Sequence, residues 1–255
     1  MTTKSRSGSG EPQTAVSVTA ALAECSDPAD AIHLQRFFKT GPGEYGEGDV
    51  FIGVRVPATR AVAKRFTELP PAEVDSLLDS DVHEHRLAAL LILNAQFARV
   101  SRPRTADPVA RERIVEQYLA AVRRGRVNNW DLVDSSSEYV LGAWLLDRPR
   151  DLLDELAASD VLWERRVAML ATFAFIKAGD ASTTLVLAER FLPDRADLMQ
   201  KAVGWMLREV GKRVDRAVLL DFLEQHAHEM GRTALSYATE HFDAETRARL
   251  RALTG

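Results

Sequence analysis

Trp130 and Asp134 stand four residues apart in the segment VNNWDLVDSSSEYVLGAW (127–144), a spacing that places them on one side of a helix. The apolar stripe of this helix runs beside the pair, through Val133, Val140, Leu141 and Trp144. A carboxylate and an indole kept off the core-facing stripe are residue types that can stabilise a positive charge on a bound molecule. The alternative is a surface aspartate near the start of a helix, where the helix dipole favours it.

A second mixed face is predicted in the segment QKAVGWMLREVGKR (200–213). Beside its core stripe runs a row made of Lys201, Trp205, Arg208 and Lys212. An aromatic side chain between three cations on one helix face is typical of a surface that binds phosphates. The alternative is a half-buried tryptophan that is flanked by solvated cations.

Arginines cluster in two further places. Arg165 and Arg166 are adjacent in WERRVAM, and Arg126 ends the run VRRGR shortly before Trp130. A doubled arginine on a helix is most often a solvated face, so these residues alone define no site. The helices that carry Trp130 and Trp205 also offer cationic groups, however, and a row of such groups would allow DNA binding without sequence preference, through counterion release.

The composition limits the class of protein. The chain has 255 residues, a formal net charge of −4 and one cysteine, Cys25. The charge excludes a uniformly basic nucleic-acid-binding protein, so a surface for anions must come from local segregation of charge. The single cysteine excludes an internal disulfide and fits a reducing cytosol, so we expect a cytoplasmic protein. No apolar run reaches the ~20 residues of a membrane span.

Nearly all of the chain has the apolar periodicity of helices, and alternation of period two is absent. We expect residues 1–14 to form a disordered tail and residues 15–255 to form a single all-α domain. Proline or aspartate precedes most helical segments, at positions that favour the start of a helix. The one long irregular stretch is GPGEYGEGDVFIGVRVP (41–57).

The predicted helices are also self-similar. HRLAALLI begins at His85 and RRVAMLAT at Arg165, which places Arg86 and Arg166 80 residues apart, and Trp205 follows Arg166 by 39 residues. A period near 40 with two helices per unit is typical of HEAT-like repeats. Such repeats stack into a curved solenoid whose concave face comes from one helix of each pair. The sequence therefore predicts an all-α HEAT-like solenoid with a concave DNA-binding face.

Five segments in this order resemble the bacterial DNA alkylation repair glycosylases built from HEAT-like repeats, the AlkD family. They are GEGDVFIGVRVPATR (46–60), HEHRLAALLIL (83–93), NNWDLVDSS (128–136), WERRVAMLATF (163–173) and KAVGWMLREVGK (201–212). The resemblance places the tryptophan and the aspartate of the family's W-D-x-V-D motif at Trp130 and Asp134, and its second tryptophan at Trp205. The family's active-site arginine falls on Arg166, with Arg165 as the competing assignment.

The resemblance implies a glycosylase that removes cationic N-alkylated purines, such as 3-methyladenine and 7-methylguanine, from duplex DNA. No positioned lysine nucleophile is apparent, so we expect a monofunctional enzyme without lyase activity. A cationic base leaves as a neutral molecule and needs no general acid, whereas the deoxyribose becomes positive as the N-glycosidic bond lengthens. A carboxylate at about 4 Å would stabilise that charge by roughly 4 kcal/mol at an effective dielectric near 20, or about three powers of ten in rate. We expect Asp134 to supply this carboxylate.

The resemblance also assigns the contacts to DNA. We expect Trp130 and Trp205 to pack against the lesion nucleotide and Arg166 to hold a phosphate. The remaining expected backbone contacts are Lys201, Arg208, Lys212, Arg165 and Arg126. Relatives often carry arginine where this chain has Ser236, so one peripheral phosphate contact is expected to be missing.

No metal and no cofactor are expected. The histidines of HEHR are two residues apart and do not form the H-E-x-x-H zinc motif, and GPGEYGEGD lacks the G-K-[ST] of a phosphate-binding loop. Two other functions stay open: a non-catalytic relative that binds damaged or unusual DNA, and a helical scaffold that binds proteins. We expect a monomer, and the loop over residues 40–56 to influence whether small or bulky lesions are accepted.

Overall fold

The computed structural model describes residues 11–253. Helices connected by turns and loops make up the described chain, together with one isolated bridge between Val50 and Val82, so the predicted all-α fold is confirmed. The chain divides into two compact units, with the boundary between Gln96 and Phe97. The single domain over 15–255 stays a prediction, as does the curvature of the solenoid. Residues 1–10 of the predicted tail lie outside the described residues.

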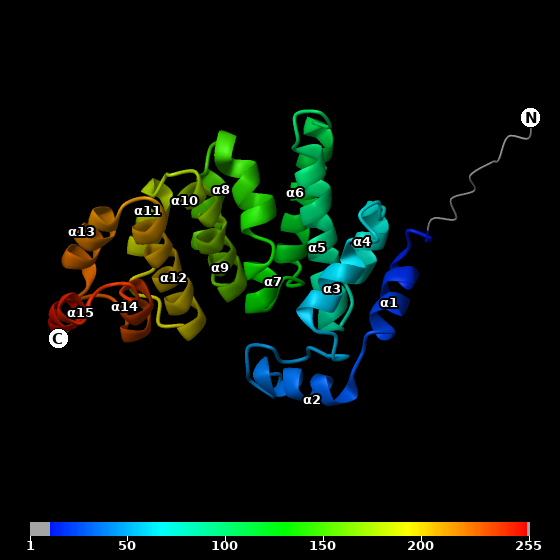
Figure 1. Ribbon diagram of the computed structural model, residues 1–255, viewed down its shortest axis with the longest axis horizontal. Coiled ribbons are helices and arrows are strands. Elements are labelled where there is room, and N and C mark those ends of the chain that lie inside the picture. The colour runs from blue at the N-terminus through cyan, green and yellow to red at the C-terminus, as the bar shows by residue number, and fades with distance from the viewer. Residues whose placement is uncertain (1–10, 254–255) are drawn as a thin grey trace, which may run out of the picture. The chain divides into compact units, whose positions relative to one another are not determined.

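The first unit contains α1 (Ala15–Ala23), α2 (Pro28–Phe37), α3 (Val56–Ala63), α4 (Pro71–Leu78) and most of α5 (His83–Val100) (Figure 1). Proline is the first residue of α2 and α4 and the second residue of α3, where its missing N–H costs nothing. The Asp27 side chain caps α2 by accepting hydrogen bonds from the backbone of Ala29 and Asp30. Gln13, inside the predicted tail, donates to the carbonyl of Arg65 at 3.1 Å.

The irregular stretch of the first unit is fixed by buried charged groups of α5. The Glu84 carboxylate accepts hydrogen bonds from the backbone N–H groups of Ile52, Gly53 and Val54, at 2.9–3.2 Å. Gly53 has φ 82°, and a Cβ there would lie 1.9 Å from the Asp27 carbonyl oxygen, so only glycine fits. These bonds hold the end of the stretch, residues 52–54, against the start of α5.

A second buried cluster in the first unit joins the same stretch to α5. Asp49 Oδ1 accepts from Arg86 Nη2 at 2.5 Å, and Asp49 Oδ2 lies 3.0 Å from His83 Nδ1. Arg86 Nη1 also donates to the Ser80 carbonyl at 2.7 Å. The Asp49, His83 and Arg86 side chains are at most 3% exposed, so this cluster is part of the core.

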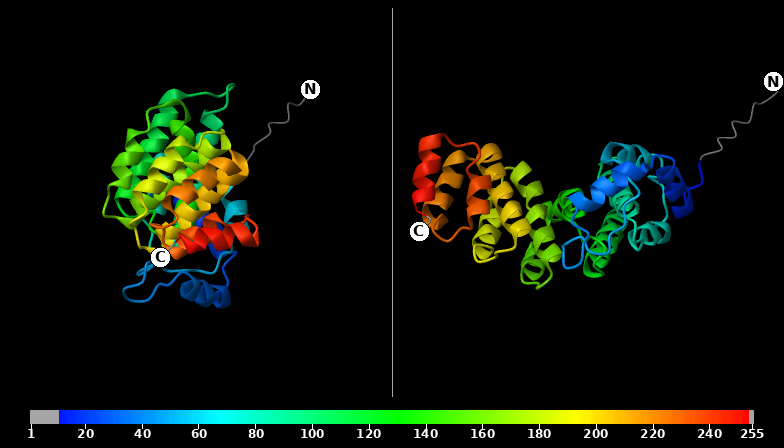
Figure 2. Two further views of the ribbon diagram at one scale, coloured as in Figure 1. Left: turned by 90° about the vertical axis from the view of Figure 1, so that its left-hand side faces the viewer. Right: turned by 90° about the horizontal axis from the view of Figure 1, so that it is seen from below.

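The second unit contains the helices that follow α5. They are α6 (Pro108–Arg123), α7 (Trp130–Asp134), the π-helix η1 (Glu138–Gly142), the 3₁₀ turn η2 (Leu145–Asp147), α8 (Asp151–Ala157), α9 (Leu162–Ala171), α10 (Phe173–Lys177), α11 (Ser182–Arg190), α12 (Asp197–Arg213), α13 (Arg216–His226), α14 (Arg232–Ala238) and α15 (Ala244–Ala252). Figure 2 shows these helices following one another in chain order, from green to red.

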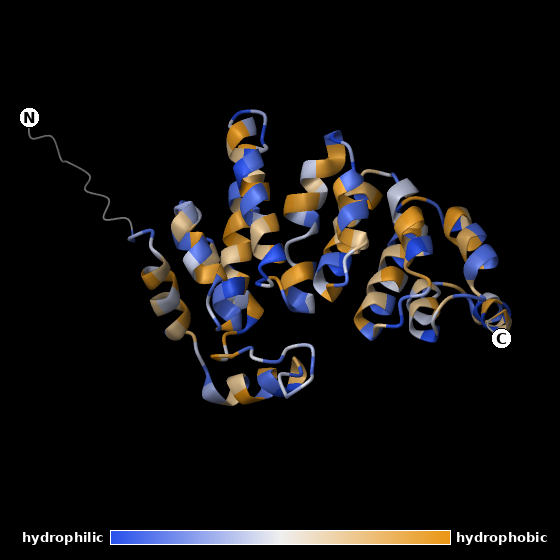
Figure 3. Cartoon of the chain, turned by 180° about the vertical axis from the view of Figure 1, so that it is seen from behind, coloured by the Kyte–Doolittle hydropathy of each residue, from blue (hydrophilic) through white to orange (hydrophobic). Residues whose placement is uncertain are grey.

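Most of these helices lie in two layers. α7, α9, α12 and α14 form one layer, in which α9 packs on α7 and α12, and α12 packs on α14. α8, α11 and α13 form the other layer, each packed on a helix of the first. The helices carry hydrophobic and hydrophilic residues on different sides, as Figure 3 shows, because one face of each is buried. The first layer carries every predicted catalytic residue.

Two glycines set the spacing between neighbouring elements of the second unit. A Cβ on Gly142 of η1 would lie 2.2 Å from the Ala171 carbonyl oxygen. A Cβ on Gly204 of α12 would lie 2.4 Å from the Ala234 carbonyl oxygen and 2.6 Å from Cβ of Tyr237. Both contacts are too close for any side chain, so η1 and α12 approach their neighbours only because of these glycines.

Candidate active site

The segment that carries Trp130 and Asp134 is shorter and less regular than predicted. α7 begins after Asn129, whose buried side chain accepts a hydrogen bond from the Trp130 N–H at 2.8 Å, and it ends at Asp134. Ser136 Oγ and Ser137 Oγ donate to the carbonyls of Leu132 and Val133, at 2.6 and 2.8 Å. Such serine bonds compete with the helical ladder. The chain therefore turns at 135–137 and continues as the π-helix η1.

Asp134 is the last residue of α7, not a residue near the start of a long helix. Its carboxylate forms a bidentate ion pair with Arg166 of α9: Nε lies 3.0 Å from Oδ1, and Nη2 lies 2.9 Å from Oδ2. The Arg166 side chain is 4% exposed, whereas that of Asp134 is 17% exposed. The pair is thus buried on the arginine side and open on the carboxylate side.

Burial raises the pKa of the Asp134 carboxyl above its ordinary value, and the nearby Asp131 adds to this, although the charge and hydrogen bonds of Arg166 act in the opposite direction. A carboxylate that is held in a poorly solvated position interacts strongly with any cation brought beside it. Such an attraction would stabilise a transition state in which positive charge develops on the substrate.

A buried hydroxyl cluster lies next to Asp134. The hydroxyl of Tyr118, from α6, lies 3.1 Å from Ser137 Oγ and 3.2 Å from Ser136 Oγ. Burial raises the pKa of Tyr118 to about 12, and the Asp134 charge contributes to this shift. The cluster fixes the turn that ends α7, and so it fixes the position of the carboxylate.

Arg166 connects the two helices that carry the predicted catalytic residues. Besides Asp134 of α7, its guanidinium donates to the carbonyl of Leu198 at the start of α12. From the sequence, Arg166 was predicted to lie outside the core and to hold a phosphate. The structure buries it, and its guanidinium faces a carboxylate and a carbonyl.

Arg165 occupies a different, repeated position. It lies 2.9 Å from Asp194 and donates to the carbonyl of Ser159, six residues earlier, as Arg86 does to the carbonyl of Ser80. Both arginines follow a Ser-Asp-Val sequence at the same interval. The repeat equivalent of Arg86 is therefore Arg165, and the predicted pairing of Arg86 with Arg166 is wrong by one residue. Arg166 is the additional arginine, and it is the one beside Asp134.

Trp130 and Trp205 are both partly exposed, and both lie on helices that pack against α9. The Trp205 ring lies 6.0 Å from that of Phe173, with the planes tilted by 58°. The Lys177 ammonium and the Arg213 guanidinium lie 4.5 and 5.2 Å from the Phe173 ring centre. Trp205 thus belongs to a group of aromatic rings and cations at the junction of α10 and α12.

The predicted DNA contacts have different surroundings. Lys201 pairs with Asp197 at 2.8 Å, and Arg208 pairs with Glu240 and lies 3.4 Å from Glu209. Lys212 is exposed near the end of α12, and Arg126 is partly exposed in the turn between α6 and α7. The structure therefore keeps three of the predicted cations, Lys201, Arg208 and Lys212, along α12.

Comparison with known protein families identifies the chain. The family described as "DNA alkylation repair enzyme" matches residues 18–242. The chain belongs to this family of DNA repair enzymes. The resemblance inferred from the five sequence segments is therefore confirmed, as is a role in the repair of alkylation damage.

A solved structure agrees in fold with this DNA alkylation repair family. The protein is described as a predicted DNA alkylation repair enzyme from Enterococcus faecalis, and it superposes with a TM-score of 0.64 over 86% of this chain and 97% of its own, at 18% identity. A comparison with curated proteins finds no match. Within residues 11–253, no helix combines the length and the apolar character that a membrane crossing needs.

Several residues around the site of this alkylation repair protein carry no local signal in the sequence. Tyr118 resembled any core residue of α6, and no local pattern connects it with the serines after Asp134. Phe173 and Lys177 were missed for the same reason, because they are brought to Trp205 only by the packing of α10 on α12. The serine run 135–137 was the one visible signal, since serines at the i and i+4 spacing can terminate a helix.

Proposed function

We propose that this protein is a DNA glycosylase that hydrolyses the N-glycosidic bond of cationic N-alkylated purines in duplex DNA. The observation that carries the proposal is the Asp134 carboxylate, which is held by Arg166, is partly open to solvent, and follows Trp130 on the same short helix. The substrates would include 3-methyladenine and 7-methylguanine.

The proposed reaction needs one well-placed anion. The bond between the sugar C1′ and the purine nitrogen breaks, and its electron pair stays on the base, which leaves as a neutral molecule because it began as a cation. The positive charge moves to C1′ and the ring oxygen of the deoxyribose. Asp134 stabilises this charge by roughly 4 kcal/mol at about 4 Å and an effective dielectric near 20. Water then attacks C1′ and releases a proton to Asp134 or to solvent, which leaves an abasic site.

Arg166 acts as a positioning residue in this proposal. The N–H groups at Nε and Nη2 bind the two carboxylate oxygens, so Asp134 presents its remaining lone pairs in one direction. Its third contact, to Leu198, joins the orientation of the carboxylate to the start of the helix that carries Trp205. Trp130 and Trp205 would flank the sugar of the lesion nucleotide, and the α12 cations Lys201, Arg208 and Lys212 would bind backbone phosphates.

The proposal is tested with a duplex that contains a single 7-methylguanine. Release of the free base is measured in single-turnover reactions at saturating protein, for the wild type and for Asp134→Asn. We expect the excision rate to fall about a thousandfold in the variant, because the charge that stabilises the sugar is lost. Affinity for the same duplex, measured by fluorescence anisotropy, should stay within about threefold.

The outcomes separate the candidate functions. Binding of damaged duplex by the wild type without release of base would support the non-catalytic relative instead. If the protein were instead a scaffold that binds other proteins, no salt-dependent binding of DNA would be measured. Glu155→Gln, which removes an exposed carboxylate that pairs with Arg123 on the same unit, is the matched control, and its excision rate should equal that of the wild type.

We propose that the enzyme stops at the abasic site. Lys177, the lysine of the Trp205 group, forms an ion pair with Glu138, so its amine is bound by that carboxylate and is not a free nucleophile. Incubation with a duplex that contains an abasic site, in the presence of borohydride, should trap no covalent adduct. A trapped adduct that disappears in Lys177→Arg would contradict this part of the proposal.

A further inference from the structure

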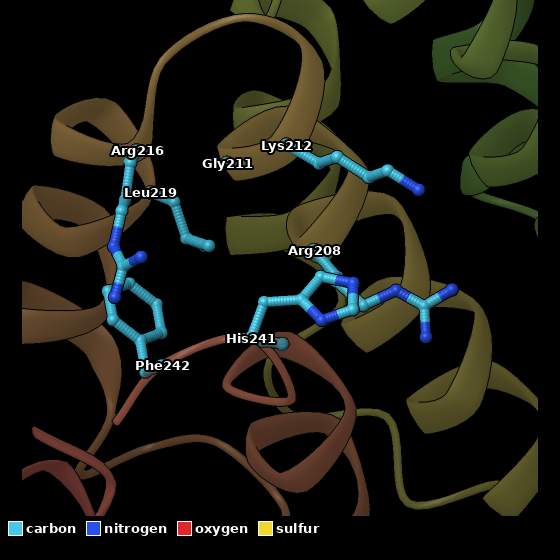
Figure 4. Close-up of a pocket in the computed structure, with 8 residues that line it drawn as sticks. Arg208, Gly211, Lys212, Arg216, Leu219, His241 and Phe242 are labelled. Atoms are coloured by element: carbon cyan, nitrogen blue, oxygen red, sulfur yellow. The ribbon is translucent and has the colours of Figure 1, made fainter. Parts of the chain in front are cut away.

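A pocket lies at the far end of α12 from Lys201, where α12, α13 and the turn after α14 meet (Figure 4). Its volume is about 390 Å³. Arg208, Lys212, Arg216 and His241 line it. In Figure 4, Arg216 lies along Phe242 on one side of the pocket, and Arg208 and Lys212 lie on the other. Three basic side chains and a histidine thus surround one cavity.

The charges around this pocket are only partly neutralised. No carboxylate is among its described lining residues. Arg208 pairs with Glu240 and lies 3.4 Å from the buried Glu209, whose charge also acts on Lys212, but neither Lys212 nor Arg216 forms a salt bridge with another described residue. Arg216 instead lies over the ring of Phe242, with its guanidinium carbon 4.5 Å from the ring centre. Cations gathered around a cavity repel one another, and an anion bound between them would relieve that repulsion.

The floor of the pocket is apolar. Leu219 and Phe242 are each at least 93% buried, and both line the cavity. A cavity with an apolar floor and a cationic rim suits a ligand that has both an anionic group and a hydrocarbon surface. A phosphate joined to a deoxyribose has both, since the faces of the sugar carry C–H groups. A bare inorganic anion would leave the floor uncovered.

The position of the pocket relates it to the proposed active site. Arg208 follows Trp205 by about one helical turn, and Lys212 follows it by about two, which is roughly 10 Å along α12. Along one DNA strand the charges are spaced by about 3.4 Å of helix axis. A strand that places its damaged nucleotide at Trp205 and runs along α12 would reach the pocket within about three nucleotides.

We propose that this pocket binds one sugar–phosphate unit of the DNA backbone, within about three nucleotides of the damaged base. Lys212 and Arg216 bind the phosphate. Arg208 breaks its salt bridge with Glu240 and binds the same phosphate, and the sugar covers Leu219. His241 adds a hydrogen-bond donor. The inference rests on the proposed function, because it takes the lesion to lie at Trp205. It adds Arg216 and His241, which the sequence did not single out, to the DNA-binding surface.

The test replaces single phosphates of the DNA with neutral methylphosphonates. The probe is a duplex with a stable tetrahydrofuran abasic analogue, so binding is measured without any excision, and failure of the glycosylase proposal would leave this measurement intact. Each phosphate within five nucleotides of the analogue is neutralised in turn. In the wild type, one position within three nucleotides should lower affinity about five- to tenfold.

The variants locate that phosphate. In Arg216→Gln and in Lys212→Gln, affinity for the unmodified duplex should fall about five- to tenfold, and the methylphosphonate at that same position should have no further effect. The slope of log affinity against log salt should become shallower by about one. Arg232→Gln is the matched control, because Arg232 lies on α14 but outside this pocket, and it should keep the sensitive position.

Two results would overturn the inference. In one, the effects of Arg216→Gln and of each methylphosphonate on DNA affinity are additive. This would mean that Arg216 attracts DNA only through the long-range electrostatic field of the protein and contacts no single phosphate. In the other, free thymidine monophosphate binds the wild type in calorimetry and is lost in Arg216→Gln, while no backbone position is sensitive. That result would assign the pocket to a free nucleotide instead of DNA.

Discussion

Each unit of the molecule contains an aspartate that is bound by an arginine, and the two pairs differ in what surrounds the carboxylate. In the first unit Asp49 is held by Arg86 and His83, and its side chain is 3% exposed. In the second unit Arg166 is the one basic residue, among those at positions 11–253, that pairs with Asp134, and the Asp134 side chain is 17% exposed. Both arginines are almost fully buried.

The difference separates a structural pair from a candidate catalytic one. Both oxygens of Asp49 contact buried neighbours, His83 and Arg86, so a ligand cannot reach the carboxylate. Asp134 is held from one side only, and burial still raises the pKa of its carboxyl. Burial of the arginine anchors the pair in both units, and exposure of the acid distinguishes them.

The largest expected effect is on the stability of the first unit. Asp49→Asn leaves the buried Arg86 without its counter-charge, so we expect the free energy of unfolding to fall by about 3–5 kcal/mol. Urea denaturation measures this change. Excision per folded molecule should be unaffected. A stable Asp49→Asn protein with lost excision would mean that the Asp49 pair takes part in the chemistry, and the contrast between the units would fail.

The next effect is on the orientation of Asp134. Arg166→Gln should lower the excision rate about ten- to a hundredfold, as is usual when a residue that orients a functional group is removed, and Arg166→Lys should not restore it because lysine cannot form the bidentate pair. Single-turnover kinetics measure both rates. The control is Arg150→Gln, which breaks another partly buried pair of the second unit, with Asp180, and should leave the rate unchanged.

A smaller effect concerns pH. Because the pKa of Asp134 is raised in the folded protein, the excision rate should fall about tenfold per pH unit once the pH drops below that value. In Arg166→Gln the decline should begin at a higher pH, since Arg166 lowers this pKa. The free energy of unfolding depends on pH in the opposite direction to the rate. The stabilisation that Asp134 contributes is present in full below its pKa in the unfolded chain, about 3.9, and is lost as the pH rises through its pKa in the folded protein.

A rate profile that is flat through acidic pH in both proteins would contradict the assignment of Asp134 as the reacting anion. Thermal denaturation of the wild type and of Asp134→Asn over the same pH range provides the second measurement. The stability difference between them should depend on pH in the window that the rate profile defines.

The smallest expected effect comes from the hydroxyl cluster beside Asp134. Tyr118→Phe removes a buried hydrogen-bond partner of Ser136 and Ser137, so we expect about 1 kcal/mol of lost stability and a rate within threefold of the wild type. Thermal unfolding and single-turnover excision measure the two quantities. A rate loss as large as that of Arg166→Gln would mean that Tyr118 belongs to the reacting groups.

Helical periodicity and the starting signals of proline and aspartate were enough to predict the all-α fold, because burial of one face dominates the stability of amphipathic helices. Periodicity failed at 135–137, where serine side chains compete with the backbone. Periodicity also failed to predict that Arg166, which interrupts an apolar face, is buried. The sequence does not reveal that the Asp134 carboxylate compensates its charge.

The candidate site was predicted as residue types but not as geometry. Trp130, Asp134 and Trp205 were singled out by spacing and by family resemblance, and their helices do pack on α9. The ion pair of Asp134 with Arg166 joins residues 32 positions apart, and no local pattern encodes such a contact. The pocket at Arg216 and His241 was missed because three separate helical segments supply its walls.

The glycines at 142 and 204 imply that the site can be damaged from a distance. Neither residue has a side chain with which to touch DNA, yet each lies where two backbones come too close for a Cβ. A single added methyl group at 204 would push α12 away from α14, and Trp205, the next residue, would move with it. Sequence changes that abolish repair could therefore occur at positions where there is nothing for a substrate to contact.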